Sequence, residues 1–340
     1  MKKKKKHIIL YIFIILAALA IIATLLIKNT VFAEYEYETT RVEIHADASG
    51  SDVENALTDA LGNSFGKKAA LLWQLQGGKP GLAHGSYEVR PGMTAIKVAR
   101  NIAKGNQTPV RFTFNNMRLI SELASRAASL LEFDSTAFMG AADSVLPAQG
   151  FTKAQYQAAF LPDTYEFYWT TSPEKVIHTL AGYRSKFWNE ERKAKAKALG
   201  LSPEEVHTIA SIVEEETNKR DEQPKVARLY INRLEKGMEL QSDPTLKFAS
   251  GNFAARRITG PLLKTESPYN TYRNKGLPPG PIRIAEAATL DAVLSAPKHN
   301  YLYMCAKADF SGYHEFATDY ARHRINAARY HRALDARGIR

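Results

Sequence analysis

The longest apolar stretch of the chain runs from Ile8 to Ile27 and contains no charged residue. Its length of about 20 residues is what a helix needs to cross the hydrocarbon core of a bilayer. The basic run Lys2–Lys6 precedes it, and lysine-rich flanks stay on the cytoplasmic side of a membrane. The pattern therefore predicts a cytoplasmic tail at residues 1–7, a transmembrane helix at residues 8–27 and export of the remainder.

A cleaved signal peptide is the competing interpretation of this segment. Val31-Phe32-Ala33 resembles a small-residue cleavage site. The apolar core of a signal peptide is usually about half as long as this one, which favours an uncleaved anchor.

Residues 36–112 have the pattern of a small mixed domain in the order β-α-α-β with a further helix. The predicted strands are Thr40–His45, in which polar and apolar residues alternate, and Gly85–Val89. Three helices are predicted: one opened by the capping-box pattern Ser51–Glu54, one near Lys67–Gln76, and one capped by Thr94 and closed by Gly105.

Residues 113–340 are predicted to form a larger mixed α/β domain, mostly helical up to Asn189. The apolar and aromatic stretch Phe160–Tyr165 is expected to be a loop that plugs the core. From Ser202 onwards, turn residues and motifs become dense. The whole chain is therefore assigned to the α+β class.

The composition narrows the possible partners. The chain has 340 residues, is 45% hydrophobic and has a net charge of +11; without the six lysines of residues 1–28, about +5 remains. This excess suits an anionic polymer or a membrane surface. No Arg/Lys stripe interleaved with aromatic residues is evident, so nucleic acid is not expected as a partner. Cys305 is the only cysteine, so an intrachain disulfide is excluded.

The stretch IASIVEEET, residues 209–217, ends an apolar run with three consecutive glutamates. Ser202, Pro203 and Glu205 form a strong helix start before it. At about 100° per residue, the apolar residues share one side of this helix, and Glu216 projects at the edge of that side. Glu214 lies well off it and Glu215 almost opposite. The pattern predicts that Glu216 is buried while Glu214 and Glu215 face water.

A carboxyl group among apolar neighbours has a raised pKa and can donate a proton near neutral pH. The alternative is that Glu216 only pairs with Arg220, one turn later, and stabilises a helix end. Three downstream stretches favour the chemical role: residues 241–245, 268–272 and 276–282. They are rich in amide, hydroxyl and aromatic groups, which match the hydroxyls and apolar faces of sugars.

Other chemistries are less well supported. His314-Glu315 lacks the second histidine that a zinc-protease helix requires. Glycine-rich phosphate loops and an activated Ser or Cys elbow are also missing from the sequence. No metal and no cofactor are therefore expected.

These motifs resemble those of the endolytic murein transglycosylases, bacterial membrane-anchored enzymes that cut peptidoglycan glycan strands. The matching stretches are IASIVEEET, VARLYINRLEKGMELQSDPT, SPYNTY and GLPPGPI, in this order. The resemblance implies that Glu216 is the catalytic acid and base, that residues 36–112 form a LysM-like module, and that the anchor lies in the bacterial cytoplasmic (inner) membrane.

The sequence departs from the family pattern at three places. Arg283-Ile284-Ala285 follows GLPPGPI where the family usually has Asn-Pro-Gly. Met304-Cys305 replaces a Phe-Val pair, and the turn near Asn115-Asn116 lacks a Glu-Gly. These departures concern the far rim of the expected site and not the helix that carries Glu216.

The implied reaction is that of a lytic murein transglycosylase, a carbon–oxygen lyase acting at MurNAc–GlcNAc bonds. Glu216 protonates the glycosidic oxygen, and its carboxylate then accepts the proton of the sugar 6-hydroxyl, which closes on C1 to give a 1,6-anhydro end. An internal nucleophile at high effective concentration makes water unnecessary. Asp243 is expected to polarise or orient the sugar. The other expected substrate-binding residues are Gln241, Thr245, Tyr269, Asn270 and Tyr272.

Two alternatives remain open at this stage. One is a non-catalytic peptidoglycan-binding scaffold of the cell-wall synthesis machinery, with a structural Glu216. The other is a muramidase that uses the two carboxylates of Glu216 and Asp243. The expected partners are peptidoglycan glycan strands and the membrane that the single helix crosses, with peptidoglycan synthases as further candidates.

Overall fold

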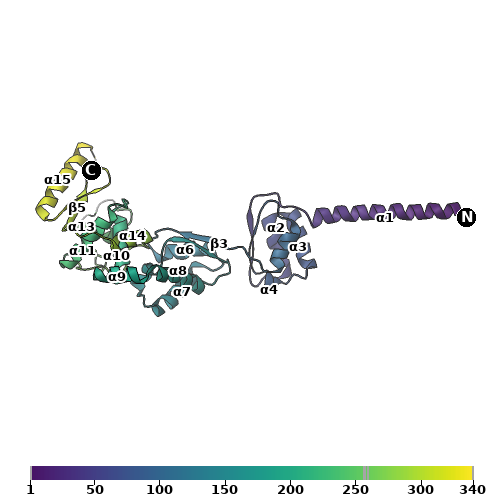
Figure 1. Cartoon of the computed structure of the whole chain (residues 1–340), viewed down its shortest axis with the longest axis horizontal. Coiled ribbons are helices and arrows are strands. Elements are labelled where there is room, and N and C mark those ends of the chain that lie inside the picture. The colour runs from purple at the N-terminus through teal and green to yellow at the C-terminus, as the bar shows by residue number, and fades with distance from the viewer. Residues whose placement is uncertain (1, 256–257, 259, 339–340) are drawn as a thin grey trace. The chain divides into compact units, whose positions relative to one another are not determined.

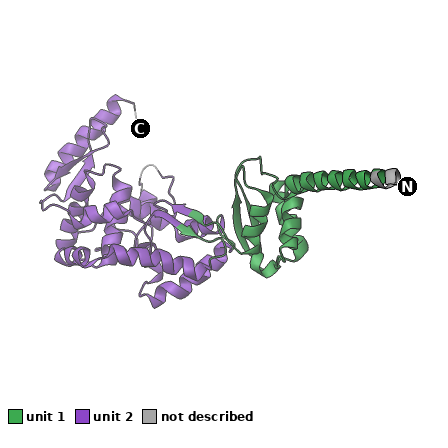
Figure 2. Ribbon diagram, turned by 45° about the vertical axis from the view of Figure 1, so that its right-hand side comes forward, with its two compact units in different colours: residues 1–111, 130–132, 166–171 green, residues 112–129, 133–165, 172–340 purple. Residues whose placement is uncertain are grey.

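The computed structural model describes residues 2–255, 258 and 260–338. The chain is α+β, as predicted, and divides into two compact units (Figure 2). Unit 1 comprises residues 1–111, 130–132 and 166–171, and unit 2 comprises residues 112–129, 133–165 and 172–340.

Unit 1 begins with one long helix, α1, Lys2–Thr30 (Figure 1). Its segment His7–Thr30 is long and apolar enough to cross a membrane, and none of it is buried inside the protein. The predicted apolar helix is therefore present and extends beyond residue 27. Its place in a membrane stays a prediction.

The rest of unit 1 is a two-stranded sheet covered by helices. The elements are β1 (Thr40–Ile44), α2 (Gly50–Leu61), α3 (Asn63–Leu75), α4 (Pro80–Ala83), β2 (Gly85–Val89) and α5 (Ala95–Ala103). β1 and β2 are antiparallel, with Thr40 opposite Val89 and Ile44 opposite Gly85. The inward residues of both strands join the helices in one core, in which Trp73 is the largest buried side chain. The LysM-like identity and the bounds 36–112 stay predictions.

The start of α2 differs from the prediction. The N-cap is Ser49 and not Ser51, because the reciprocal bonds of the capping box join Ser49 and Asp52. The Asp52 amide donates to Ser49 Oγ (3.3 Å), and the Ser49 amide donates to the Asp52 carboxylate (2.8 Å). A capping box requires an acceptor three residues after the cap, and Asp52 satisfies this for Ser49.

The elements from residue 110 onwards are mainly helical, with two short sheets. They are β3 (Val110–Phe114), α6 (Ile120–Ala128), α7 (Ser135–Ala148), η1 (Lys153–Ala159), β4 (Asp163–Phe167), α8 (Pro173–Phe187), α9 (Glu190–Ala198), α10 (Pro203–Glu216), α11 (Gln223–Glu235), α12 (Asp243–Ser250), α13 (Gly260–Leu263), α14 (Ala287–Leu294), β5 (Tyr303–Ala306), β6 (His314–Ala317) and α15 (Tyr320–Ala336). β3 pairs with β4, and β5 with β6.

Two segments predicted as loops contain regular structure. The stretch 160–165 buries Phe160 as a core plug, but its last residues begin strand β4. The stretch 241–245 is a loop only up to Ser242, because Asp243 and Pro244 open helix α12. Proline lacks a backbone N–H, but the N–H groups of the first helical turn have no partner within the helix, so proline is favoured there. This preference explains the start of α12.

Helix α10 occupies the centre of unit 2. It contacts η1, α9, α11, α12 and α14. Ser202 and Glu205 form the predicted capping box at its start, with bonds of 3.1 and 2.7 Å. The nine consecutive residues Val206–Glu214 are all buried. A helix buried on every side belongs to the interior of a domain, so the last turn of α10 is held from several directions.

Candidate active site

Glu216, the last residue of α10, lies in the wall of a cavity of about 230 Å³. The cavity is lined by Glu216, Leu229, Tyr230, Arg233, Leu240, Gln241, Asp243, Tyr272, Met304, Cys305, Ala306 and His314. These residues come from α10, α11, the 240–243 segment, the 268–272 loop and the β5–β6 hairpin. The fold thus brings together polar groups that are far apart in the sequence.

The carboxylate of Glu216 is held by two hydroxyl groups on one of its oxygens. The Tyr230 hydroxyl and Ser242 Oγ each donate a hydrogen bond of 2.6 Å to Oε1. Within the described residues, Oε2 has no hydrogen bond or ion pair. Arg220 pairs with Glu286 instead (3.3 Å), so the alternative of a Glu216–Arg220 pair is wrong.

Several opposing effects set the acidity of Glu216. Burial, the largest effect, raises the pKa of its carboxyl, and the charge of Asp243 acts in the same direction. The hydrogen bonds from Ser242 and Tyr230 and the proximity of His314 lower this pKa, but burial dominates. A carboxyl whose pKa is raised in a cavity can keep its proton and deliver it to a ligand.

The second carboxylate in the cavity belongs to Asp243, at the first turn of α12. Its Oδ1 accepts a 2.6 Å hydrogen bond from the Tyr272 hydroxyl. Burial and this bond to Asp243 raise the pKa of Tyr272, which keeps it a donor. Gln241 has a left-handed backbone conformation, with φ of 49°. Its amide donates to the Thr271 carbonyl (3.0 Å), which ties the segment before α12 to the 268–272 loop.

The β5–β6 hairpin forms another part of the cavity wall. His314 on β6 is fixed by Glu222: its amide and its Nδ1 each lie 2.8 Å from a different carboxylate oxygen. Arg233 on α11 donates to the carbonyls of Leu302 (2.6 Å) and Leu240 (2.9 Å). Arg233 thereby joins the hairpin to the segment that carries Gln241.

Three predicted site residues do not line the cavity. Thr245 and Asn270 are fully buried. The Thr245 hydroxyl donates to the Ser242 carbonyl (2.7 Å), and Asn270 Oδ1 accepts from the amide of Tyr272 (3.0 Å). Tyr269 packs against Phe248. These residues hold the loops that carry Ser242 and Tyr272, while Glu216, Gln241, Asp243 and Tyr272 reach the cavity.

Three polar residues that line the cavity, Tyr230, Arg233 and His314, are absent from the predicted site residues. Ser242, which donates to Glu216 from just outside the lining, is absent from them as well. A signal existed for Tyr230, because a buried tyrosine usually needs a partner for its hydroxyl.

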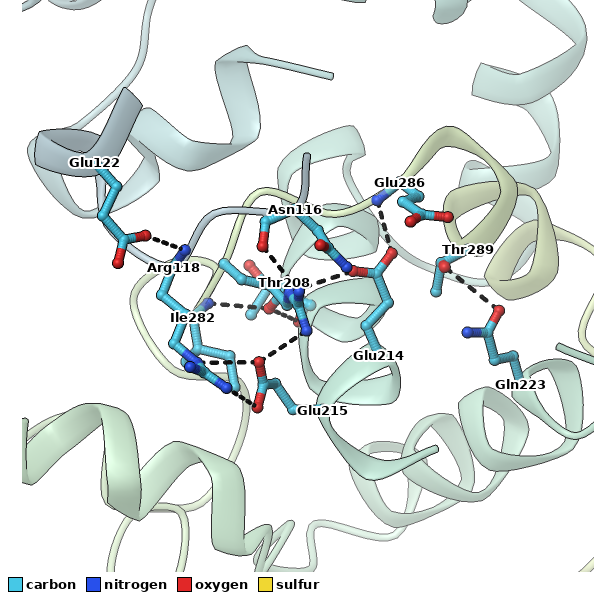
Figure 3. A network of polar contacts seen from close by, with 12 residues as sticks. Asn116, Arg118, Glu122, Thr208, Glu214, Glu215, Gln223, Ile282, Glu286 and Thr289 are labelled. Atoms are coloured by element: carbon cyan, nitrogen blue, oxygen red, sulfur yellow. Dashed lines mark hydrogen bonds and ion pairs between the residues drawn. The ribbon is translucent and has the colours of Figure 1, made fainter. Parts of the chain in front are cut away.

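Glu214 and Glu215 do not face water, so their predicted exposure is wrong (Figure 3), and Glu216, predicted to be the buried carboxylate, is only half-buried. Glu214 is 7% exposed; its Oε1 accepts from the Glu286 amide (2.6 Å), and its Oε2 lies 3.4 Å from Nε of Arg283. Glu215 pairs with Arg118 (3.0 Å) and with Arg283 (2.8 Å). Helical periodicity identifies the apolar side of α10, but it cannot show that other segments also cover the polar side.

Comparisons with known proteins identify relatives of this chain. The chain is 36% identical over 158 residues to an endolytic murein transglycosylase of Bacillus subtilis, covering 46% of this chain and 43% of that protein. It is 30% identical over 149 residues to one of Streptococcus pneumoniae serotype 2, covering 43% and 27%. The matches thus span less than half the length of these relatives.

A solved structure supports the fold over a larger part of the chain. A putative yceG-like protein from Listeria monocytogenes matches with a TM-score of 0.57 at 24% identity, covering 85% of this chain and 98% of that one. The sequence profile of the YceG-like family matches residues 42–329, which include most of the module predicted at 36–112 and every residue of the cavity. On this match across most of its length, the chain belongs to the YceG-like family.

Proposed function

We propose that this protein cleaves the glycan strands of peptidoglycan internally, at MurNAc–GlcNAc bonds, and leaves 1,6-anhydro-MurNAc ends. The observation that carries the proposal is the carboxyl of Glu216, desolvated at a cavity, with one oxygen held by two hydroxyls and the other free. The names of the relatives from Bacillus subtilis and Streptococcus pneumoniae support the same substrate and reaction.

The two oxygens of Glu216 have different roles in the proposed mechanism. Oε2 carries the proton and gives it to the glycosidic oxygen as the bond to C1 breaks. The negative charge left on the carboxylate is stabilised by the Tyr230 and Ser242 hydroxyls at Oε1. The carboxylate then takes the proton of the 6-hydroxyl, whose oxygen closes on C1. One acid is sufficient, because the nucleophile belongs to the substrate.

Asp243 supports a second candidate mechanism. It lines the same cavity, and its charge acts on Glu216. A muramidase would use Glu216 as acid and Asp243 to activate water or stabilise the sugar cation. In the transglycosylase, Asp243 and its partner Tyr272 orient the sugar instead, with Gln241 positioning the strand beside them. The third candidate, a scaffold without activity, gives Glu216 no chemical role.

The other parts of the chain are proposed to hold the catalytic domain at its substrate. Helix α1 is proposed as a single-pass anchor in the cytoplasmic membrane, with the cavity outside the cytoplasm. The module at 36–112 is proposed to hold glycan as a LysM-like domain. Peptidoglycan synthases are the proposed protein partners, because strand cutting and strand synthesis act on the same polymer.

Mass spectrometry of digested glycan separates the three candidates. Purified strands are incubated with the full-length chain in neutral detergent, and the new ends are identified. Anhydro ends support the transglycosylase, and newly formed reducing ends support the muramidase. Binding of strands without any new end supports the scaffold and would refute catalysis by Glu216.

A further inference from the structure

The C-terminal helix α15, drawn in yellow in Figure 1, carries an uncompensated positive charge. Its exposed arginines are Arg322, Arg324, Arg329 and Arg332, with Arg337 at the C-cap. In the described part of the chain, none of them forms an ion pair. The only acid within the helix is Asp335, and Asp319 is occupied as the N-cap, where it accepts from the Arg322 amide (2.8 Å).

Three of these arginines form a stripe. Arg322, Arg329 and Arg332 follow one another at spacings of seven and three residues, which places them on the same side of a helix. The stripe is roughly 15 Å long at 1.5 Å per residue. Asn326, between Arg322 and Arg329, is buried where the helix packs on β5 and β6, and its Oδ1 accepts a hydrogen bond from Arg329 (3.0 Å), so the stripe runs along the edge of the packed face. Six residues separate Arg322 from Arg329, and two separate Arg329 from Arg332, so the three arginines do not form a run in the sequence.

The helix is connected to the cavity through the β5–β6 hairpin. Met304, Cys305 and Ala306 of β5 and His314 of β6 line the cavity, and α15 packs on both strands. The Tyr303 ring lies 5.8 Å from that of Tyr320 and 5.4 Å from that of His323, centroid to centroid. Tyr320 is 60% exposed. An aromatic surface therefore lies beside the hairpin, at the start of the basic helix.

We propose that the arginine stripe of α15 binds the carboxylates of the stem peptides on the glycan strand that enters the cavity. This inference rests on the proposed function, since it assigns a peptide-recognition surface to the same substrate. The glycan offers neutral hydroxyls to the cavity, whereas its stem peptides carry carboxylate groups. Guanidinium groups recognise carboxylates through paired hydrogen bonds, and unpaired exposed arginines attract an anionic polymer.

The test compares strands with and without their peptides. The triple variant Arg322→Gln/Arg329→Gln/Arg332→Gln removes the stripe. The control Lys193→Gln/Lys195→Gln/Lys197→Gln removes the same charge from the exposed side of α9. Both are measured as full-length proteins on intact glycan strands and on strands from which an amidase has removed the stem peptides.

We expect the arginine variant to raise KM on peptide-bearing strands by about fivefold, the combined effect of three exposed ion pairs, with kcat unchanged. KM on the denuded strands should stay the same, and the α9 control should resemble the wild type on both. Equal KM changes on both substrates, no change on either, or the same loss in the control would each overturn the proposal.

Binding measured without turnover keeps this test separate from the proposed activity. Co-sedimentation of the Glu216→Gln variant should show a preference for peptide-bearing strands, and this preference should be lost when the three arginine substitutions are added. Preference without cleavage by the wild type would refute the proposed function and leave the docking surface intact. An effect of the arginines seen only in phosphatidylcholine vesicles that contain phosphatidylglycerol would overturn the proposal in favour of a lipid surface.

Discussion

The Tyr230 hydroxyl on α11 lies 2.6 Å from Oε1 of Glu216 on α10, although 14 residues separate them in sequence. Ser242 donates to the same oxygen from a third segment. Burial raises the pKa of Glu216, and these two bonds oppose that rise. Burial thus favours the protonated acid, while the two hydroxyls stabilise its anion, which is what successive acid and base steps require.

Replacing Glu216 tests whether this carboxyl carries the chemistry. Glu216→Gln preserves volume and hydrogen-bonding capacity but cannot exchange a proton, so release of anhydro-muropeptides should fall by at least about a hundredfold. Glu215→Gln weakens the pairs with Arg118 and Arg283; it should lower the melting temperature and keep turnover within a few-fold. Near-wild-type release by a folded Glu216→Gln protein would contradict the assignment.

The hydrogen bonds to Oε1 of Glu216 lead to a prediction about the pH dependence of activity. Tyr230→Phe and Ser242→Ala each remove a donor that stabilises the carboxylate, so the pKa of Glu216 should rise. Activity requires the protonated acid, and the alkaline limb of the kcat/KM profile should therefore move to higher pH, by about one unit for each variant. Tyr301→Phe, which removes a hydroxyl outside the cavity lining, is the control. An unmoved limb, or one shifted to lower pH, would refute this role.

The raised pKa of Glu216 also makes stability depend on pH. An acid whose pKa is higher in the folded than in the unfolded state destabilises the fold once it ionises, so the cost begins as pH rises past about 4 and is complete above the folded pKa. The stability advantage of Glu216→Gln over the wild type should accordingly grow between pH 4 and pH 8. Thermal melts of both proteins across this range measure it. A constant difference in melting temperature would mean that the pKa is not raised.

Arg283 should be more important for stability than Arg118, although both pair with Glu215. The Arg283 side chain is 13% exposed and also faces Glu214, and its Nη2 donates to the Asn116 carbonyl (2.8 Å). Arg283→Met removes one partner from each of the covered carboxylates of Glu214 and Glu215. It should lower the free energy of unfolding by about 3 kcal/mol. The Arg118 side chain is 41% exposed, so Arg118→Met should cost less than about 1 kcal/mol. Chemical denaturation compares them; equal losses would contradict this difference.

The topology can be tested in cells. If α1 is an uncleaved anchor, protease added to spheroplasts should degrade the domain that carries Glu216, and the intact chain should remain in the membrane fraction. A cytoplasmic marker protein controls for lysis. Full protection of the domain would reverse the orientation, and a soluble mature chain beginning near Glu34 would favour the signal-peptide interpretation.

The sequence by itself determined the local elements. The apolar run of α1, the capping box of Ser202 and the strands β1 and β2 all follow from short-range patterns, whereas the catalytic role of Glu216 stays a prediction. Such patterns succeed because caps, strand alternation and helix periodicity depend on neighbours within a few residues.

Only the tertiary structure decided what surrounds Glu216. Periodicity placed Glu214 and Glu215 in water, because it assumes one buried side, whereas α10 is covered on all sides and Arg283 reaches both carboxylates. It also could not separate Tyr272, which reaches the cavity, from its neighbour Asn270, which holds the loop. Burial and hydrogen-bond partners depend on contacts between segments that are distant in sequence, and local spacing carries no information about those contacts.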